Sequence, residues 1–241
     1  MKTFLLSSII ALAATAQAVT GFGGNVVALS LGVHLEDLRV LVAAVILTGP
    51  LQTAPIVWLD RKEIRARLFL TRLLPLALLG LGVGLWLSPR IPTTGLSTLL
   101  GVLVIAFSAR ELWRTLRRQA PAAPFPPLVE ASLYLIGGLV HGLIATGGPI
   151  IVYALARQLT DKRSLRGTLA SLWLVLNFLM IAVLVPRLEA PMEAITLGAW
   201  LLPGLAVGFG LGQWLHHRVP ERTFRLALFG LLLLAGLAAL R

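Results

Sequence analysis

The sequence predicts an all-α polytopic membrane protein built from two inverted-topology repeats. Hydrophobic residues make up 57% of the 241 positions and charged residues only 13%, too few polar groups to cover a soluble protein of this size. A glycine-broken apolar motif occurs twice, the second copy 124 positions after the first. Lysine and arginine gather in short segments between apolar runs. Composition, repetition and charge therefore indicate the same fold class.

The first repeat is predicted at residues 1–118. Its opening apolar run reaches the motif Gln17-Ala-Val-Thr-Gly-Phe-Gly-Gly-Asn25 and leaves it as a shorter apolar run ending at Val33. Windows near the roughly 20-residue length that crosses a bilayer follow at Leu38–Leu59, Leu68–Leu87 and Thr93–Leu116. Each repeat is thus expected to hold one glycine-broken segment, either re-entrant or a pair of half-helices, and three transmembrane helices.

The first residues also resemble a secretory signal. Lys2 precedes an apolar run that ends in the small-residue sequence Ala16-Gln-Ala18. However, Leu5–Ala18 corresponds to Leu128–Gly142 in the second copy, which no signal peptidase would remove. We therefore expect this segment to be retained.

A proline-rich linker at 119–127, predicted to be cytoplasmic and semi-rigid, leads to the second repeat at 128–241. The second motif is His141-Gly-Leu-Ile-Ala-Thr-Gly-Gly-Pro149, and the expected spans are Leu165–Val185, Ala194–Leu215 and Thr223–Leu240. Seven identities at an offset of 128 positions extend the duplication, and their glycines are expected at helix contacts. They are Pro75, Gly80, Gly82, Gly84, Trp86, Arg90 and Pro92, which recur as Pro203, Gly208, Gly210, Gly212, Trp214, Arg218 and Pro220.

The basic residues predict how the repeats are oriented. If every apolar segment crossed once, the basic segments 60–72 and 110–118 would face away from the basic segments 157–166 and 218–225. If each broken segment instead returns to the side it came from, all four, with 16 of the 21 lysines and arginines, lie in the cytoplasm. The first repeat then begins outside and the second inside, which makes the repeats inverted. We expect a multi-pass protein of the inner (cell) membrane.

The two breaks predict a binding site for an anion. Broken backbone at membrane depth is tolerated only where it is buried in protein or lines a wet cavity. Glycine permits positive φ and close approach, and the short helices starting at Asn25 and Pro149 would direct N–H groups and a positive dipole end into that cavity. The alternative, close helix packing at a glycine pair, explains one pair better than two at equivalent positions.

The expected binding residues are the backbone around the breaks and the few polar side chains of the apolar runs. They are Gly23, Gly24, Asn25, Gly147, Gly148, Ile150, Gln17, Thr20, Gln52, Thr146 and Asn177. Gln52 and Asn177 could instead form interhelical hydrogen bonds. His141, the histidine inside an apolar run, is a candidate for proton coupling or a structural residue with satisfied hydrogen bonds.

Several function classes are excluded or disfavoured. The absence of cysteine excludes disulfides and thiolate chemistry. The net charge of +11 is explained by loops beside lipid headgroups, and no nucleic-acid motif is present. No metal, cofactor or enzymatic activity is expected, because the deep apolar runs hold no acidic residue and His141 has no nucleophile or ligand partner at useful spacing.

With Gly21-Phe-Gly-Gly24, Gly142-Leu-Ile-Ala-Thr-Gly-Gly-Pro-Ile-Ile-Val-Tyr153 and a repeated glycine-rich span before a basic loop, the chain resembles the TauE/SafE family of sulfite and organosulfonate transporters. The resemblance covers essentially the whole chain. It implies a small polytopic protein that moves sulfite, sulfoacetate, related sulfonates, other sulfur compounds or small organic acids across the cell membrane. The family's first motif commonly carries a third glycine where this chain has Asn25, whose side chain could add a donor.

The expected function is therefore secondary transport of a small oxyanion, sulfite or an organosulfonate, by alternating access. An anion channel for the same ligands and a carrier of other sulfur compounds or small carboxylates remain alternatives. The expected partners are the anionic substrate, the lipid bilayer and, through His141, protons. A membrane scaffold would instead tolerate leucine at Gly24 or Gly148 without loss of transport.

Overall fold

The computed structural model describes residues 2–117, 123–159, 161–188, 191–216 and scattered positions from 218 to 237. The predicted last span, Thr223–Leu240, lies largely outside the described residues, as do positions 119–122 of the linker and the end of the basic segment 110–118. Over the described part of the chain every regular element is a helix, and seven helices are long and apolar enough to cross a membrane. The predicted all-α membrane fold is confirmed.

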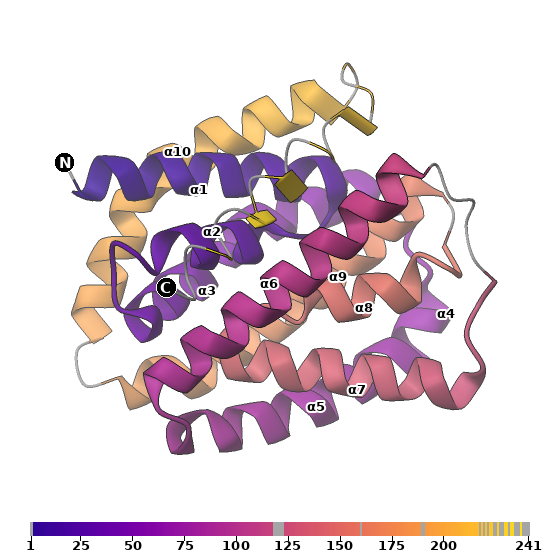
Figure 1. Ribbon diagram of the computed structural model, residues 1–241, viewed down its shortest axis with the longest axis horizontal. Helices are drawn as coiled ribbons and strands as arrows, with labels where there is room; N and C mark the ends of the chain where they lie inside the picture. Colours follow the sequence, from indigo (N-terminus) through magenta and orange to yellow (C-terminus); the bar gives the residue numbers. More distant parts are fainter. Residues whose placement is uncertain are drawn as a thin grey trace.

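The helices follow the chain in two series (Figure 1). The first series comprises α1 (Lys2–Thr20), α2 (Gly24–Gly32), α3 (Leu38–Asp60), α4 (Ala66–Leu68), a π-helical turn (Phe69–Leu73), α5 (Leu74–Leu87), a 3-10 turn (Ser88–Arg90) and α6 (Thr93–Leu116). The second comprises α7 (Pro127–Ile144), α8 (Gly148–Leu155), α9 (Lys162–Leu184), a 3-10 turn (Val185–Arg187) and α10 (Pro191–His216).

Aspartates start the two central helices in the same way. The Asp37 carboxylate accepts the N–H of Arg39 at 2.8 Å at the start of α3, and the Asp161 carboxylate accepts the N–H of Ser164 at 2.8 Å at the start of α9. Such caps satisfy backbone donors that have no partner within the helix. Because Asp37 and Asp161 are 124 positions apart, α3 and α9 begin at equivalent places in the two copies.

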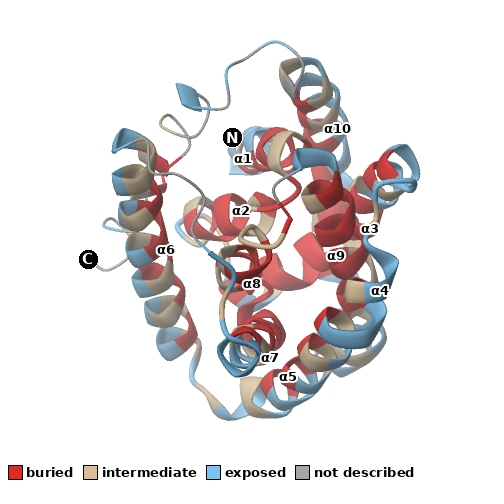
Figure 2. Cartoon of the chain, turned by 90° about the vertical axis from the view of Figure 1, so that its right-hand side faces the viewer, coloured by how far each residue is buried: buried red, intermediate tan, exposed pale blue. Residues whose placement is uncertain are grey.

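Each broken segment returns toward the place where it began. The Lys2 ammonium at the start of α1 lies 3.0 Å from the Glu36 carboxylate, which follows α2. In the second series the Arg157 guanidinium, which follows α8, donates to the Ala123 carbonyl before α7 at 3.2 Å. α2 and α8 lie in the interior of the bundle, where most of their residues are buried (Figure 2). The two breaks are therefore held inside the protein.

Glycines let the helices of one series pack closely on the broken segment of the other. α10 packs on α1 because a Cβ on Gly208 or Gly212 would overlap backbone atoms of Ala11 or Thr15. α5 packs on α7 in the same way, with Gly80 and Gly84 against the backbone of Leu135 and Leu139. Four of the six repeated glycines are thus at helix contacts. Gly82 and Gly210 are not, since a Cβ there meets nothing within 4 Å.

This packing gives a stability prediction. We expect Gly208→Val to lower the free energy of unfolding by about 1–3 kcal/mol, because α10 would have to move away from α1. Gly210→Val, on the same helix with open space around it, is the matched control and should change stability by less than about 0.5 kcal/mol. Thermal unfolding of both variants in detergent measures the difference. Equal melting temperatures would contradict the inferred contact.

Tryptophan and arginine pair at the ends of the long helices. Four tryptophan rings are exposed, and the guanidinium of a nearby arginine lies 4.0–4.8 Å from the centroid of each ring. The pairs are Trp58 with Arg61, Trp86 with Arg90, Trp113 with Arg117 and Trp214 with Arg218. An amphipathic ring beside a cation suits the boundary between hydrocarbon and headgroups. Such pairs are typical of side chains that anchor helices at the membrane interface.

Candidate functional site

The first break is a tight turn closed by one glutamine. Gly21 and Gly23 have φ of 80° and 87°, which side chains rarely adopt. The Gln17 side-chain amide donates to the Gly21 carbonyl at 3.2 Å, and its oxygen accepts the Gly24 N–H at 3.0 Å. The Trp173 indole N–H from α9 donates to the same Gly21 carbonyl at 3.0 Å. Two side chains therefore fix the backbone that leads into α2.

The second break uses an alanine where the first uses a glycine. Ala145, with φ of 54°, is the non-glycine residue of positive φ in the described part of the chain, and it stands 124 positions after Gly21. An L-residue in this region is uncommon and costs about 1 kcal/mol or more. The Asn25 side-chain amide donates to the Ala145 carbonyl at 2.8 Å. The two breaks are thus joined directly to each other.

A small cavity lies where the breaks meet, with about 20 Å³ of free space, room for about one water molecule. It is at mid-depth, because Gly49 and Trp173, which line it, are the middle residues of α3 and α9. No lysine, arginine, aspartate or glutamate is among the described residues around it. The lining residues are Gln17, Gly23, Asn25, Val26, Gly49, Gln52, Thr53, His141, Ala145, Thr146, Gly148, Trp173 and Asn177.

Three buried side chains at this cavity have hydrogen-bonding atoms without partners. The unpartnered atoms are both ring nitrogens of His141, the Thr146 hydroxyl and the Asn177 side-chain carbonyl. The Asn177 amide lies near the imidazole, but no pair of their atoms has hydrogen-bond geometry. The His141 ring stacks on Trp173 with centroids 5.3 Å apart. Since buried polar groups are normally satisfied, such a cluster at a cavity marks a place for a polar ligand.

The structure places eight of the twelve residues expected at the site in the lining of the cavity and leaves the other four outside that lining. The eight that line the cavity are Gln17, Gly23, Asn25, Gln52, His141, Thr146, Gly148 and Asn177. Thr20, Gly24, Gly147 and Ile150 are not among the residues around it. The Gly24 N–H is already bonded to Gln17, and the Thr20 hydroxyl bonds to the Ala16 and Phe22 carbonyls. Gln52 does form an interhelical hydrogen bond, from its side-chain amide to the Ala14 carbonyl at 3.0 Å.

Comparison with known proteins gives the family. The profile described as "Sulfite exporter TauE/SafE" matches residues 6–239. The chain belongs to the TauE/SafE family. It is also 30% identical over 169 residues to "Probable inner membrane transporter protein TsaS" of Comamonas testosteroni, a match that covers 69% of each chain. No solved structure matches. Family, relative and helices together show a multi-pass inner-membrane protein of a sulfite/organosulfonate-type transporter family.

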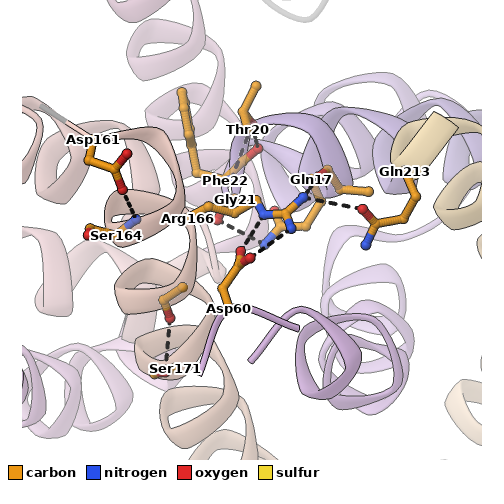
Figure 3. Close-up of polar contacts among 12 residues, drawn as sticks. Gln17, Thr20, Gly21, Phe22, Asp60, Asp161, Ser164, Arg166, Ser171 and Gln213 are labelled. Atoms are coloured by element: carbon orange, nitrogen blue, oxygen red, sulfur yellow. Dashed lines mark hydrogen bonds and ion pairs between the residues drawn. The ribbon is translucent and has the colours of Figure 1, made fainter. Parts of the chain in front are cut away.

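This TauE/SafE member also contains a buried ion pair that sequence reasoning missed. Arg166, expected in a cytoplasmic basic loop, lies in the second turn of α9 with 5% of its surface exposed, and Asp60 at the end of α3 is 4% exposed. The guanidinium meets the carboxylate through two hydrogen bonds, of 2.5 and 3.1 Å (Figure 3). It also donates to the Ala18 carbonyl at 2.9 Å and to the Gln213 side-chain oxygen at 3.3 Å.

The ion pair lies next to the first break. The backbone of Gly21 approaches Arg166 so closely that a Cβ there would lie 2.7 Å from the arginine Cα. Arg166 therefore connects α3, α1 and α10 just outside the cavity. Buried carboxylates also occur at Glu111 and Glu130, near the ends of α6 and α7. Acidic groups are therefore buried in this fold, although none is among the described residues that line the cavity.

Proposed function

We propose that this TauE/SafE protein is a secondary transporter that holds a small oxyanion, sulfite or the head of an organosulfonate, in the cavity between the two breaks. The observation that carries the proposal is the cluster of unpartnered polar groups of His141, Thr146 and Asn177 at mid-depth. The sulfite-exporter description of the family supports this ligand class, and the relative's printed name, a probable inner membrane transporter, supports a role in transport.

The chemistry of the lining favours an anion of low charge. α2 and α8 start at the cavity, and the first N–H groups of a helix have no intrahelical partner and carry a positive partial charge. The described residues around the cavity include no lysine or arginine to neutralise the ligand, so binding is moderate and release remains possible. A free space of about 20 Å³ is smaller than sulfite, which means that the lining moves when the ligand binds. Compact ligands require the least movement.

Alternating access would open the cavity toward each end of the antiparallel pair α3 and α9. Asp60 and Arg166 lie two helical turns from Thr53 and Trp173, and the ion pair closes this end. The loop after Asp60 is rich in arginine and lysine, so we place it in the cytoplasm. We further propose that the two series are inverted repeats, because α5 packs on α7 as α10 packs on α1 and both broken segments return to their starting sides.

Gly148 offers the sharpest test of the site. A Cβ at Gly148 would lie 3.7 Å from the Trp173 ring, so alanine fits, whereas leucine would fill the cavity. In proteoliposomes we expect Gly148→Ala to retain most sulfite transport and Gly148→Leu to lose at least about 100-fold, since a ligand excluded from its site loses several kcal/mol of binding. Gly210→Leu, at an open position, is the control for insertion and folding.

The same vesicles distinguish a carrier from a channel and show which anions compete as substrates. Countertransport of labelled sulfite against its gradient supports a carrier, and flux that only runs downhill supports the channel alternative. Sulfate, thiosulfate, taurine, sulfoacetate and small carboxylates serve as competitors. If Gly148→Leu is folded and transports like the wild type, the central cavity is not the binding site.

A further inference from the structure

A second cavity, of about 260 Å³, lies at the opposite end of the α3–α9 pair from Asp60 and Arg166. Five segments from both series enclose it: the starts of α3 and α6, the turn after α5, and the ends of α7 and α9. Most of its lining is leucine, isoleucine, valine, alanine or proline. Because five segments contribute to its lining, it is a space between helices and not a groove on one lipid-facing helix.

This cavity is aligned with the central one. Val42 on α3 precedes Gly49 by two helical turns, and Leu184 on α9 follows Asn177 by two turns, so the two cavities lie along the same faces about 10 Å apart. Leu143 and Ile144 form a wall of the second cavity directly before the strained Ala145, which lines the central cavity. The Ser88 hydroxyl donates to the Leu143 carbonyl at 3.3 Å and ties this wall to the end of α5.

Among the described residues that line the second cavity, the charged ones are two arginines. Arg39 and Arg187 are exposed, and no acidic residue is among the described residues around the cavity. The Arg39 side chain donates to the Ile91 carbonyl at 3.2 Å, which holds the guanidinium at the α5–α6 turn. The Asp37 carboxylate nearby accepts backbone N–H groups at the start of α3. Two guanidinium groups above an apolar chamber complement an anion that carries an apolar body.

We propose that this cavity is an access site, in which Arg39 and Arg187 take up an organic anion from the aqueous phase before its head enters the central cavity. The ligand class is a sulfonate or carboxylate with a short apolar body, which the volume of about 260 Å³ can hold and the central cavity cannot. The site rests on the proposed function, because it delivers the anion to the central groups. With this access site the two ends of the transport path differ chemically. The Asp60–Arg166 ion pair lies at one end, and a chamber lined by Arg39 and Arg187 lies at the other.

The test compares Arg39→Gln/Arg187→Gln with Arg90→Gln in proteoliposomes. Arg90 is an exposed arginine at the same end, stacked on Trp86 and not part of the cavity, so it is the matched control. With butanesulfonate as substrate we expect the double variant to raise the apparent KM about tenfold at low salt, with an unchanged maximal rate, because capture of the charged ligand is weakened. The difference should shrink in high salt, and Arg39→Lys/Arg187→Lys should restore most of the affinity.

A second variant tests the chamber itself. Ala43→Leu fills apolar space in this cavity without altering the central residues, so it should impair butanesulfonate transport more than sulfite transport. A wild-type KM in the double glutamine variant, or equal loss for both anions in Ala43→Leu, overturns the access site. An effect that vanishes in vesicles lacking anionic lipid also overturns it, since the occupant would then be a lipid headgroup. If the wild type itself transports no oxyanion, the proposed function fails instead.

Discussion

Replacing Arg166 with methionine is expected to lower the free energy of unfolding by about 3–5 kcal/mol, because the Asp60 carboxylate would stay buried without its partner. The double variant Asp60→Leu/Arg166→Met removes both charges and should recover most of this loss. Arg163→Met is the control, since Arg163 is exposed on the same helix and should matter by less than about 0.5 kcal/mol. Thermal unfolding in detergent measures all three.

The same double variant tests whether the ion pair closes one end of the transport path. The chain has no cysteine, so a cysteine replacing the buried Ser171 on α9 would be its single thiol. If the pair holds α3 against α9, this thiol should react faster with a water-soluble reagent when both charges are removed. Unchanged reactivity in a stable double variant would mean that the pair stabilises the fold and has no part in opening.

The helices of this fold could be predicted because the bilayer sets their length. Apolar runs of about 20 residues have few alternatives to a membrane-spanning helix. The breaks were also predictable, but their geometry was not. Positive φ at Gly21 is normal for glycine, whereas the equivalent strain at Ala145 has no local signal in the sequence. Only alignment of the two copies, 124 positions apart, indicates that Ala145 takes the place of Gly21.

The candidate site was predictable in part, because polar residues inside apolar runs are costly unless they have a role. Gln17, Gln52 and Asn177 were found in this way and line the cavity. Gly49 and Trp173 gave no such signal, because glycine is common at helix contacts and tryptophan is common at membrane boundaries. Gly24 was expected to present a free N–H, but Gln17 accepts it, and hydrogen bonds of this kind depend on side-chain geometry that sequence spacing does not define.

Arg166 was missed because its charge fits two environments. A basic residue near the start of a transmembrane helix normally extends to the headgroups and supports the positive-inside pattern. Its actual partner, Asp60, is 106 positions away and directly follows a predicted span. The useful signal was the spacing of seven residues between Arg166 and Trp173, which puts both on one face of α9.

His141→Phe is expected to separate stability from function. The two ring nitrogens of His141 are buried without partners, so phenylalanine, which can keep the stacking on Trp173, should leave the free energy of unfolding unchanged or raise it by about 1–2 kcal/mol. The same change removes donors that an anion in the cavity would use. A hydrogen bond to a charged group contributes about 1.5–3 kcal/mol, so the apparent affinity for sulfite should fall about 10- to 100-fold.

Tyr134→Phe is the matched control for this prediction. The Tyr134 hydroxyl is also buried on α7, two turns before His141. It lies near the Glu130 carboxylate without hydrogen-bond geometry to it, and it is not among the residues of the central cavity. Both variants should therefore behave alike in thermal unfolding and differ in sulfite transport. A structural histidine would give the opposite pattern, with stability lost in His141→Phe and affinity retained. If His141 lowers stability in the empty protein and raises affinity for the ligand, the function of its ring nitrogens is to bind that ligand.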